Sequence, residues 1–244
     1  ADFAIDSSTG VLTFVSTPDY ESPADDGADN EYIVIVTVTD GYNTVIQTIT
    51  VTVTAVSEFG PSITSNGNGP TASISFAENT VAPVTTVTSS DTDNGDAHTY
   101  SKSGTDAADF AIDSSTGVLT FVSTPNSESA ADDDTNNEYI VIVTVTDSGG
   151  LPDSQTITVT VTDDNEHAPS ITSNSGGPTA SISYAENNTA AVTTVTSSDA
   201  DYTSTAAYSI SGGADALDFD IVSSTGVLTF VSTPDYESPA DDGG

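Results

Sequence analysis

The chain has 244 residues, of which 35% are hydrophobic, and this is enough for two domains of ordinary size with apolar cores. It carries 37 Asp and Glu against a single basic residue, Lys102, for a formal net charge of −36. Such a surface repels nucleic acid and anionic membranes and favours cations as partners. The absence of Cys excludes disulfides and thiolate metal sites, and is consistent with a long secreted chain that has no bridges.

No apolar run approaches the ~20 residues of a membrane helix, so membrane insertion is not expected, and no signal peptide is visible. Residue 1 is Ala and Met is absent, and we therefore expect a mature form, a fragment or a window from a longer protein. Two plain explanations of the acids stay open, a solvated surface and an adaptation to salty water. Neither explains why particular acids recur at fixed places.

The chain repeats itself with a period of about 108 residues. The string ADFAIDSSTGVLTFVSTP begins at Ala1 and returns at Ala108, and LDFDIVSSTGVLTFVSTP begins at Leu217, at spacings of 108 − 1 = 107 and 217 − 108 = 109. GPSITSNGNGPTASISFAEN from Gly60 likewise answers APSITSNSGGPTASISYAEN from Ala168. The first and third copies continue as STPDYESPADDG and the middle one as STPNSESAADDD, so the larger unit is a pair.

Within one repeat, the elements in chain order are all strands and turns. DSSTGVLTF at 113–121 places Thr-Gly between two apolar runs, which predicts a tight hairpin with Gly117 at positive φ. EYIVIVTVT at 138–146 and SQTITVTVT at 154–162 alternate apolar residues with polar ones, mostly Thr, which predicts strands with one buried face. The fold class expected is all-β, with each repeat a Greek-key β-sandwich.

The repeats divide the chain into one complete unit and two parts of units. We expect the C-terminal part of a repeat at 1–58, a complete repeat at 59–166 and the N-terminal part of a repeat at 167–244. A partial sandwich leaves strand edges unpaired and its apolar face wet, so a free monomer of this length is expected to fray at both ends. Flanking sequence or neighbouring copies in a polymer would supply the missing strands.

The junction after the complete repeat is rich in oxygen ligands. In VTVTDDNEHAPSITS, which ends at Ser173, a strand runs directly into three acids, an Asn and a His. Carboxylates gathered there repel one another by about 4 kcal/mol per pair at 4 Å, and no Lys or Arg is close in sequence to neutralise them. A hard divalent cation is the remaining partner, and oxygen ligands of this kind suit Ca²⁺ better than Mg²⁺ or Zn²⁺. The candidate ligands are Glu78, Glu128, Asp163, Asn165, Glu166, Asp199 and Asp201.

The whole chain resembles tandem cadherin repeats, in the bacterial cadherin-like form found in large secreted adhesins and surface fibres. The resemblance rests on an ordered set of motifs: AEN near the first strand, a DxD, IDxxTGxL, an Asp-x-Glu position, a TD closing a strand and a linker like DxNDNxP. It implies a cadherin or immunoglobulin-like sandwich, an extracellular or bacterial cell-surface location, and calcium at the joints. The upstream ligands it implies are Glu78, Glu128, Asp163 and Glu166, and the downstream ones Asp199 and Asp201, with Asn165 bridging and His167 offering its backbone carbonyl.

Two departures from the family pattern weaken the joints. Glu166 and His167 replace the family's Asp and Asn, and Asn126 replaces the Asp of the Asp-x-Glu position, so one or two ions are expected there. At the first junction Ala55 and Ser57 stand in place of Asp163 and Asn165, leaving Glu58 as the linker acid. We expect a weak, partial or empty site there, joined by packing of Phe59. The surrounding acids at this junction are Asp19, Glu21, Asp91, Asp93 and Asp147.

The sequence favours a calcium-stabilised rod segment of an extracellular bacterial adhesin. The alternative is a self-assembling structural filament or matrix protein whose repeats are completed by neighbouring chains. Adhesion partners are either copies of the chain or a cell-surface or glycan ligand, which the similar repeats do not distinguish. The Thr rows of VTVTVT are ordinary for a solvated strand face, and enzymatic glycoside hydrolysis is not expected because Trp is absent and the same acids recur in every unit.

Overall fold

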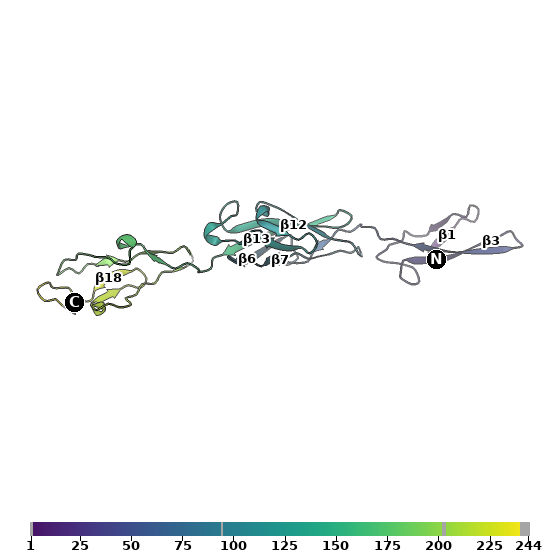
Figure 1. Ribbon diagram of the computed structural model, residues 1–244. Coiled ribbons are helices and arrows are strands. Elements are labelled where there is room, and N and C mark those ends of the chain that lie inside the picture. Colours follow the sequence, from purple (N-terminus) through teal and green to yellow (C-terminus); the bar gives the residue numbers. More distant parts are fainter. Residues whose placement is uncertain (1, 94, 202–203, 240–244) are drawn as a thin grey trace. The chain divides into compact units, whose positions relative to one another are not determined.

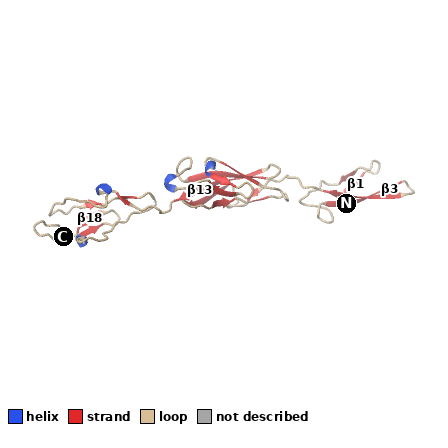
Figure 2. Ribbon diagram, in the orientation of Figure 1, coloured by secondary structure: helices blue, strands red, loops and turns tan. Residues whose placement is uncertain are grey.

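The computed structural model of the protein describes residues 2–93, 95–201 and 204–239 (Figure 1). Parts of the predicted third repeat, 202–203 and 240–244, lie outside the described residues. Strands and loops make up nearly all of the described chain, which contains no α-helix, so the all-β prediction is confirmed (Figure 2). The short 3-10 helices are η1 (Ala107–Asp109), η2 (Ser127–Ser129), η3 (Asn174–Gly176) and η4 (Ala216–Asp218).

The middle of the chain forms a sandwich of two sheets. One has four strands in the order β6-β13-β12-β9, the other three in the order β10-β11-β7, and a short pair β5-β8 lies apart from both sheets. The strands are β5 (Ser62–Ile63), β6 (Thr71–Ala77), β7 (Pro83–Thr86), β8 (Ser89–Ser90), β9 (Thr99–Ser103), β10 (Phe110–Ile112), β11 (Val118–Phe121), β12 (Glu138–Thr146) and β13 (Pro152–Thr162).

The strand β12 shows why this sequence forms a two-layer core. Its register with β13 is antiparallel along its whole length, and with β9 over its second half. Tyr139, Val141, Val143 and Val145 point to one face and are at most 1% exposed, whereas the residues between them are partly or fully exposed. The predicted strand 138–146 is confirmed with the same bounds, and the next strand begins two residues earlier than predicted, at Pro152.

Aromatic rings from both sheets form the centre of the core. Phe110 and Phe121, across the β10–β11 hairpin, have ring centroids 4.6 Å apart, and Tyr139 of the other sheet meets Phe121 edge-on at 5.1 Å. Phe76 of β6 lies 5.3 Å from Phe121 on the same side of the core. Gly117 has φ of 71° in this hairpin, as predicted. The core therefore joins strands that are far apart in sequence.

Residues 2–58 repeat only the second half of this arrangement. The hairpin β1–β2 carries Phe3 and Phe14, which pack against Tyr32 as their counterparts pack against Tyr139. The sequence EYIVIVTVT of β3 is identical to that of β12, yet β3 pairs only with β4 among the described residues. The strands are β1 (Phe3–Ile5), β2 (Leu12–Phe14), β3 (Glu31–Thr39) and β4 (Thr44–Thr52).

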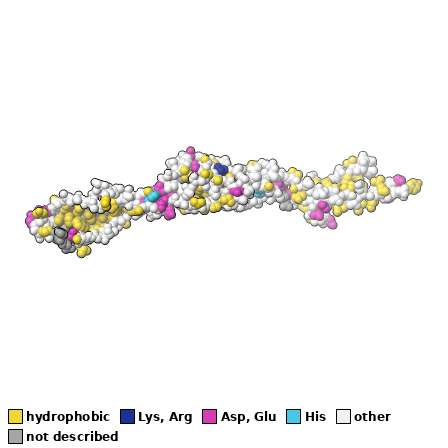
Figure 3. All heavy atoms as spheres, viewed as in Figure 1, with side chains coloured by type: hydrophobic (Ala, Val, Ile, Leu, Met, Phe, Trp, Pro, Cys, Tyr) yellow, Lys and Arg dark blue, Asp and Glu magenta, His cyan; other side chains and the backbone are white. Residues whose placement is uncertain are grey.

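Residues 167–239 repeat the first half. The segments 179–185 and 207–211 match β6 and part of β9 in sequence but form no strand, because the described residues of this part offer no counterpart of β13 or β12 to pair with. The strands are β14 (Ser170–Ile171), β15 (Thr193–Thr194), β16 (Ser197–Ser198), β17 (Phe219–Ile221) and β18 (Val227–Phe230). Hydrophobic side chains gather over the part that contains β18 (Figure 3).

The chain divides into two compact units. The first comprises Ala1–Phe76, Thr80–Pro125 and Ala131–Thr160, and the second Ala77–Asn79, Asn126–Ala130 and Val161–Gly244. Each group of acids described below lies within a single unit. Over the residues that the structure describes, no helix is long and apolar enough to cross a membrane.

Candidate metal centres

One group of acids follows the ends of β6 and β13 and the short helix η2. We call it the downstream cluster, and it comprises Glu78, Glu128, Asp163, Glu166, Asp199 and Asp201. Glu78 comes directly after β6 and is 2% exposed. Its Oε2 accepts a hydrogen bond from the backbone N–H of Ser127 at 2.7 Å, and its Oε1 accepts one from that of Asp164 at 2.7 Å. These donors fix a buried carboxylate at the start of the linker.

Three carboxylates of this cluster converge on one hydroxyl group. Ser127 Oγ lies 2.9 Å from Glu78 Oε1, 2.8 Å from Glu128 Oε1 and 3.3 Å from Asp163 Oδ1. A hydroxyl has one proton and donates to one acceptor at a time. Oxygens of the three carboxylates lie within 4.8 Å of one another, and Glu128 Oε2 is buried with no hydrogen-bond partner among the described residues.

The acids of the downstream cluster titrate in opposite directions. Burial favours a higher pKa for Glu78, but the N–H groups of Ser127 and Asp164 outweigh it and hold that pKa below its ordinary value. Burial raises the pKa of Glu128, and the neighbouring Asp163 and Glu78 raise it further. A cation bound between these groups would offset both effects on Glu128.

The linker after β13 brings further ligand atoms to the same place. Glu166 Oε1 accepts a hydrogen bond from Asn79 Nδ2 at 2.6 Å, and ligand atoms of Glu128, Glu166 and His167 lie within 4.8 Å of one another. The imidazole of His167 therefore lies beside the acids, on the exposed side of the cluster. Asn165 is exposed, and its backbone N–H donates to Asp164 Oδ1.

The DxD pair of the third repeat is held against the linker by a backbone contact. Asp201 is 1% exposed, and its Oδ2 accepts from the N–H of His167 at 2.8 Å. Its own N–H donates to Asp199 Oδ1 at 3.3 Å, which closes a small turn. Within the described part of the chain, Asp201 Oδ1 is buried without a hydrogen-bond partner. A buried carboxylate oxygen in this condition is costly unless a cation meets it.

The second group of acids lies within the first compact unit, and we call it the upstream cluster. Its members are Asp19, Glu21, Glu58, Asp91, Asp93, Asp96 and Asp147. Oxygens of Glu21, Glu58 and Asp93 lie within 4.8 Å of one another. The backbone N–H of Phe59 donates to Asp93 Oδ2 at 2.9 Å, the counterpart of the His167–Asp201 contact. The two linkers are therefore fastened to a DxD in the same way despite their different sequences.

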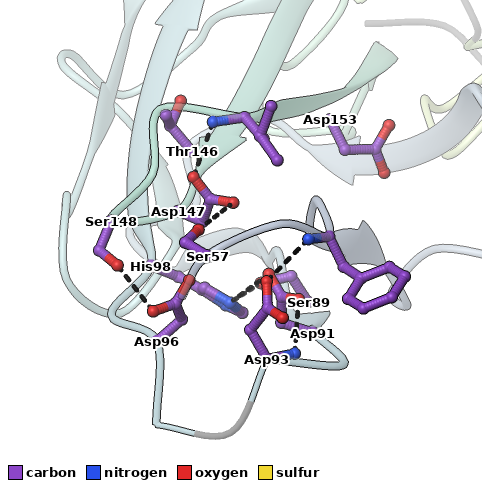
Figure 4. Close-up of polar contacts among 12 residues, drawn as sticks. Ser57, Ser89, Asp91, Asp93, Asp96, His98, Thr146, Asp147, Ser148 and Asp153 are labelled. Carbon is purple, nitrogen blue, oxygen red and sulfur yellow. Dashed lines mark hydrogen bonds and ion pairs between the residues drawn. The ribbon is translucent and has the colours of Figure 1, made fainter. Parts of the chain in front are cut away.

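Figure 4 shows how the upstream cluster is tied to the end of β12. Asp147 follows this strand and is 6% exposed. Its Oδ1 accepts from the N–H of Leu151 at 2.7 Å and its Oδ2 from Ser57 Oγ at 3.2 Å, so both oxygens have donors. Asp19 uses its Oδ1 to cap a turn, accepting from the N–H groups of Glu21 and Ser22. These two acids hold the fold around the cluster.

The linker acid Glu58 feels the neighbouring negative charges. Loss of contact with water raises its pKa, and Asp93, Glu21 and Asp19 raise it further. Both carboxylate oxygens of Glu21 and Oδ1 of Asp93 are buried with no hydrogen-bond partner in the described chain. The first junction, expected to be weak, thus holds as many buried acids without proton donors as the second.

Several residues of these clusters were not predicted from the sequence. Asp96 joins Asp91 and Asp93 within 4.8 Å, and Ser127 is the shared donor of the downstream cluster. A third group, near the C-terminal end, places oxygens of Glu186, Asp235 and Glu237 within 4.8 Å of one another. The repeat itself carried the signal for this group, because 186 − 78 = 108 and 237 − 128 = 109.

The donors present fit a hard divalent cation. They are carboxylate oxygens with a few carbonyl groups nearby, and Ca²⁺ takes 6–8 such ligands. The only basic residue, Lys102, donates to the carbonyl of Ala107 at 2.5 Å. No arginine exists in the chain to pair with the clustered acids, and acids without a cationic partner repel.

Comparison with known proteins identifies the fold. Residues 72–162 match the family model of the Cadherin domain. The human protein Protocadherin Fat 4 is 32% identical over 130 residues, which cover 52% of this chain and 2% of Fat 4. The chain therefore spans a small fraction of the length of that relative. The cadherin family consists of non-enzymatic adhesion domains that are extracellular and bind Ca²⁺.

Solved structures resemble the chain over nearly its whole length. Repeats EC21–23 of human CDH23 have a TM-score of 0.70 at 21% identity, and cover 97% of this chain and 73% of that one. Repeats EC22–24 of mouse Cadherin-23 give 0.65 at 21% identity, with 97% and 73% covered. Repeats EC3–6 of protocadherin gammaB7, solved as a cis dimer, give 0.70 at 21% identity, with 98% and 58% covered. Residues 72–162 thus carry a cadherin domain, and the chain has the β-sandwich fold of cadherin extracellular repeats.

Proposed function

We propose that the chain is a calcium-stabilised rod segment of an extracellular adhesin or surface fibre, which extends a cell-surface adhesion protein. Its units would be the repeat parts 1–58 and 167–244 and the complete repeat 59–166. Calcium would bind at both linkers, and the repeats would act as spacers. The adhesion partners are then copies of the chain or a cell-surface or glycan ligand.

The observation that carries this proposal is the convergence of buried carboxylate oxygens that lack proton donors. Asp93 Oδ1 and Asp201 Oδ1 occupy equivalent places beside the two linkers, and neither has a hydrogen-bond partner among the described residues. Asp93 and Asp201 are 4% and 1% exposed. Water therefore does not solvate these charges freely, and no basic side chain can neutralise them. A bound cation removes the cost of burying them.

The bacterial origin is supported by the sequence alone. Nearly identical repeats, a net charge of −36 and the absence of Cys are typical of long bacterial surface proteins that fold without disulfides. The curated relative and the solved neighbours with a named source are mammalian, so this part of the proposal rests on composition and on the repeats. A bacterial fibre would meet calcium outside the cell.

Calcium titration by calorimetry on the full chain tests the proposal. We expect Asp93→Asn and Asp201→Asn each to lower calcium affinity at its own linker by about tenfold or more, because each removes a charged ligand. Glu138→Gln is the control, since it removes an exposed acid on β12 outside the clusters. No heat of binding at millimolar calcium, or an equal loss in Glu138→Gln, would contradict the proposal.

A second candidate function, self-assembly into a filament, is favoured by an exposed aromatic cavity. Tyr184, Phe219 and Phe230 line a cavity of about 400 Å³ in the second unit. Their spacings of 5.3 and 4.5 Å match those of Phe76, Phe121 and Phe110, which Tyr139 of β12 covers in the complete repeat. A strand like β12 from a neighbouring chain would fill this cavity.

Sedimentation at several protein concentrations in EDTA distinguishes the two functions. A filament held by strand exchange would grow with concentration without calcium, and Phe230→Ser would abolish this growth by opening the cavity. Species that stay monomeric in EDTA at every concentration would eliminate the second candidate. The calorimetric result for the calcium sites does not depend on this outcome.

A further inference from the structure

The loop between β8 and β9 brings four ligand atoms together, and one of them is nitrogen. The atoms are Asp91 Oδ2, Asp93 Oδ1, Asp96 Oδ2 and His98 Nε2, and each is buried with no hydrogen-bond partner among the described residues. Oxygens of the three acids lie within 4.8 Å of one another, and His98 Nε2 is 3.5 Å from Asp91 Oδ2 (Figure 4). We call these four residues the His98 site.

Each acid of the His98 site is held through one oxygen, which leaves the other for a ligand. Asp91 Oδ1 accepts from the N–H of Asp93 at 3.1 Å, and Asp93 Oδ2 accepts from the N–H of Phe59 at 2.9 Å. Asp96 Oδ1 accepts from Ser148 Oγ at 2.7 Å. The side chain of Asp91 is 4% exposed and Asp93 is 4% exposed, so the remaining oxygens are shielded from water. The geometry is that of fixed ligands around a common point.

The imidazole is oriented in the manner of a metal ligand. His98 Nδ1 lies 2.7 Å from Ser89 Oγ, and that hydroxyl lies 2.8 Å from the Tyr100 hydroxyl. When Nδ1–H donates to Ser89, Nε2 keeps its lone pair and faces the acids. Metal-bound histidines usually make such a bond with their other ring nitrogen, because it fixes the ring and its tautomer.

We propose that Asp91, Asp93, Asp96 and His98 form a site for a transition-metal dication, Zn²⁺ being the best fit. One imidazole nitrogen with three carboxylate oxygens matches the four-coordinate N/O ligation of Zn²⁺, whereas Ca²⁺ takes oxygen ligands. The inference refines the proposed function, because Asp91 and Asp93 also belong to the upstream cluster. Zinc would compete with calcium at this linker and leave the downstream cluster to calcium.

The third repeat provides a matched comparison in the same chain. Its loop keeps the acid pair as Asp199 and Asp201, and keeps the hydroxyl contact between Ser197 and Tyr208 at 2.9 Å. At the positions of Asp96 and His98, however, it has Ser204 and Ala206, since 96 + 108 = 204 and 98 + 108 = 206. This loop therefore has the oxygen ligands alone. Zinc is expected to discriminate between the two loops.

Cobalt(II) absorption and zinc competition on the full chain test the proposal. The wild-type chain is expected to bind one Co²⁺ with the intense visible bands of four-coordinate geometry, and Zn²⁺ should displace it. His98→Gln is expected to lose at least about tenfold in zinc affinity while its calcium affinity changes less than twofold. His167→Gln, which removes the only other imidazole, is the control and should bind zinc as the wild type does.

Nitrogen NMR of the two imidazoles gives a direct reading of ligation, in which zinc should shift Nε2 of His98. The double substitution Ser204→Asp with Ala206→His is expected to create a second zinc site in the third repeat. Equal zinc affinity in the wild type and His98→Gln, or an unchanged His98 spectrum, would overturn the inference. Loss of calcium binding alone would instead contradict the proposed function and leave the zinc site standing.

Discussion

At the scale of single residues, the tight hairpin of each repeat depends on one aspartate and one glycine. Asp113 Oδ1 accepts from the N–H groups of Ser115 and Thr116 and from Ser115 Oγ, at 2.7 to 2.9 Å. These bonds lower the pKa of Asp113 to about 2, from an ordinary value of 3.8. Asp6 repeats the arrangement with the same pKa, whereas the third copy has Val222 at this position.

This pKa predicts how the hairpin responds to acid. Because the folded pKa of Asp113 is depressed, the charged form stabilises the fold above the unfolded pKa near 4, and this contribution is lost as the pH falls toward 2. In Asp113→Asn, the free energy of unfolding should therefore depend less on pH between about 4 and 2. Carboxyl NMR titration measures the pKa itself, and a midpoint at the ordinary value would refute the account.

Gly117 is the residue that the same turn tolerates least in altered form. It has φ of +71°, and a Cβ there would meet the carbonyl oxygen of Val87 at 2.1 Å. Gly117→Ala should lower the free energy of unfolding by roughly 2–5 kcal/mol, from left-handed strain and overpacking together. Gly10→Ala is the matched control, with φ of +74° and no described atom within 4 Å, and should cost about 1–2 kcal/mol. Denaturant unfolding measures both, and equal losses would show that the contact with Val87 is unimportant.

At the scale of elements, one sequence occurs in two environments. Both β3 and β12 read EYIVIVTVT, but β12 lies between β13 and β9, whereas β3 has β4 as its sole described neighbour. Val145 of β12 is fully buried, and the equivalent Val38 of β3 is 62% exposed. Local sequence therefore specifies the strand, and its neighbours decide how much it is buried.

Hydrogen exchange tests this difference. Amides of β12 should exchange at least about tenfold more slowly than the identical residues of β3, because opening β12 disrupts two strand pairings and a packed core. The comparison is internal, since intrinsic exchange rates of identical sequences are nearly the same. Equal protection of β3 and β12 would mean that β3 is covered in solution, by a partner strand or by another chain.

The sequence predicted the strands by their alternation and the repeats by their self-similarity, but it did not contain the pairing partners. The strand at 138–146 has the predicted bounds, because alternating β-branched residues specify a half-buried strand. By contrast, 179–185 nearly duplicates β6 and yet is irregular, because β6 is a strand only through its pairing with β13. Element type was therefore predictable where local pattern determines it, and not where a distant strand does.

At the scale of the whole molecule, the acids fall into two classes that the sequence does not separate. Asp132 is buried, and its two oxygens accept from the backbone N–H groups of Asn136 and Asn137, so it needs no cation. Asp93 and Asp201 are as deeply buried, and each keeps one oxygen without a described donor. Motif order named Asp93 and Asp201 as ligand candidates, but the roles of Ser127, Asp96 and His98 depend on contacts that sequence spacing does not reveal. Calcium binding at these residues stays a prediction.

The most direct test is the melting temperature of the full chain in calcium, compared with magnesium and with sodium chloride of the same ionic strength. Calcium at a thousandfold excess over Kd stabilises the folded state by about 4 kcal/mol, which predicts a rise of roughly 8–16 °C. The rise should be smaller in magnesium and nearly absent in Asp93→Asn combined with Asp201→Asn. An equal rise in sodium chloride would contradict the account, because the acids would then form a salt-adapted surface that any ion screens.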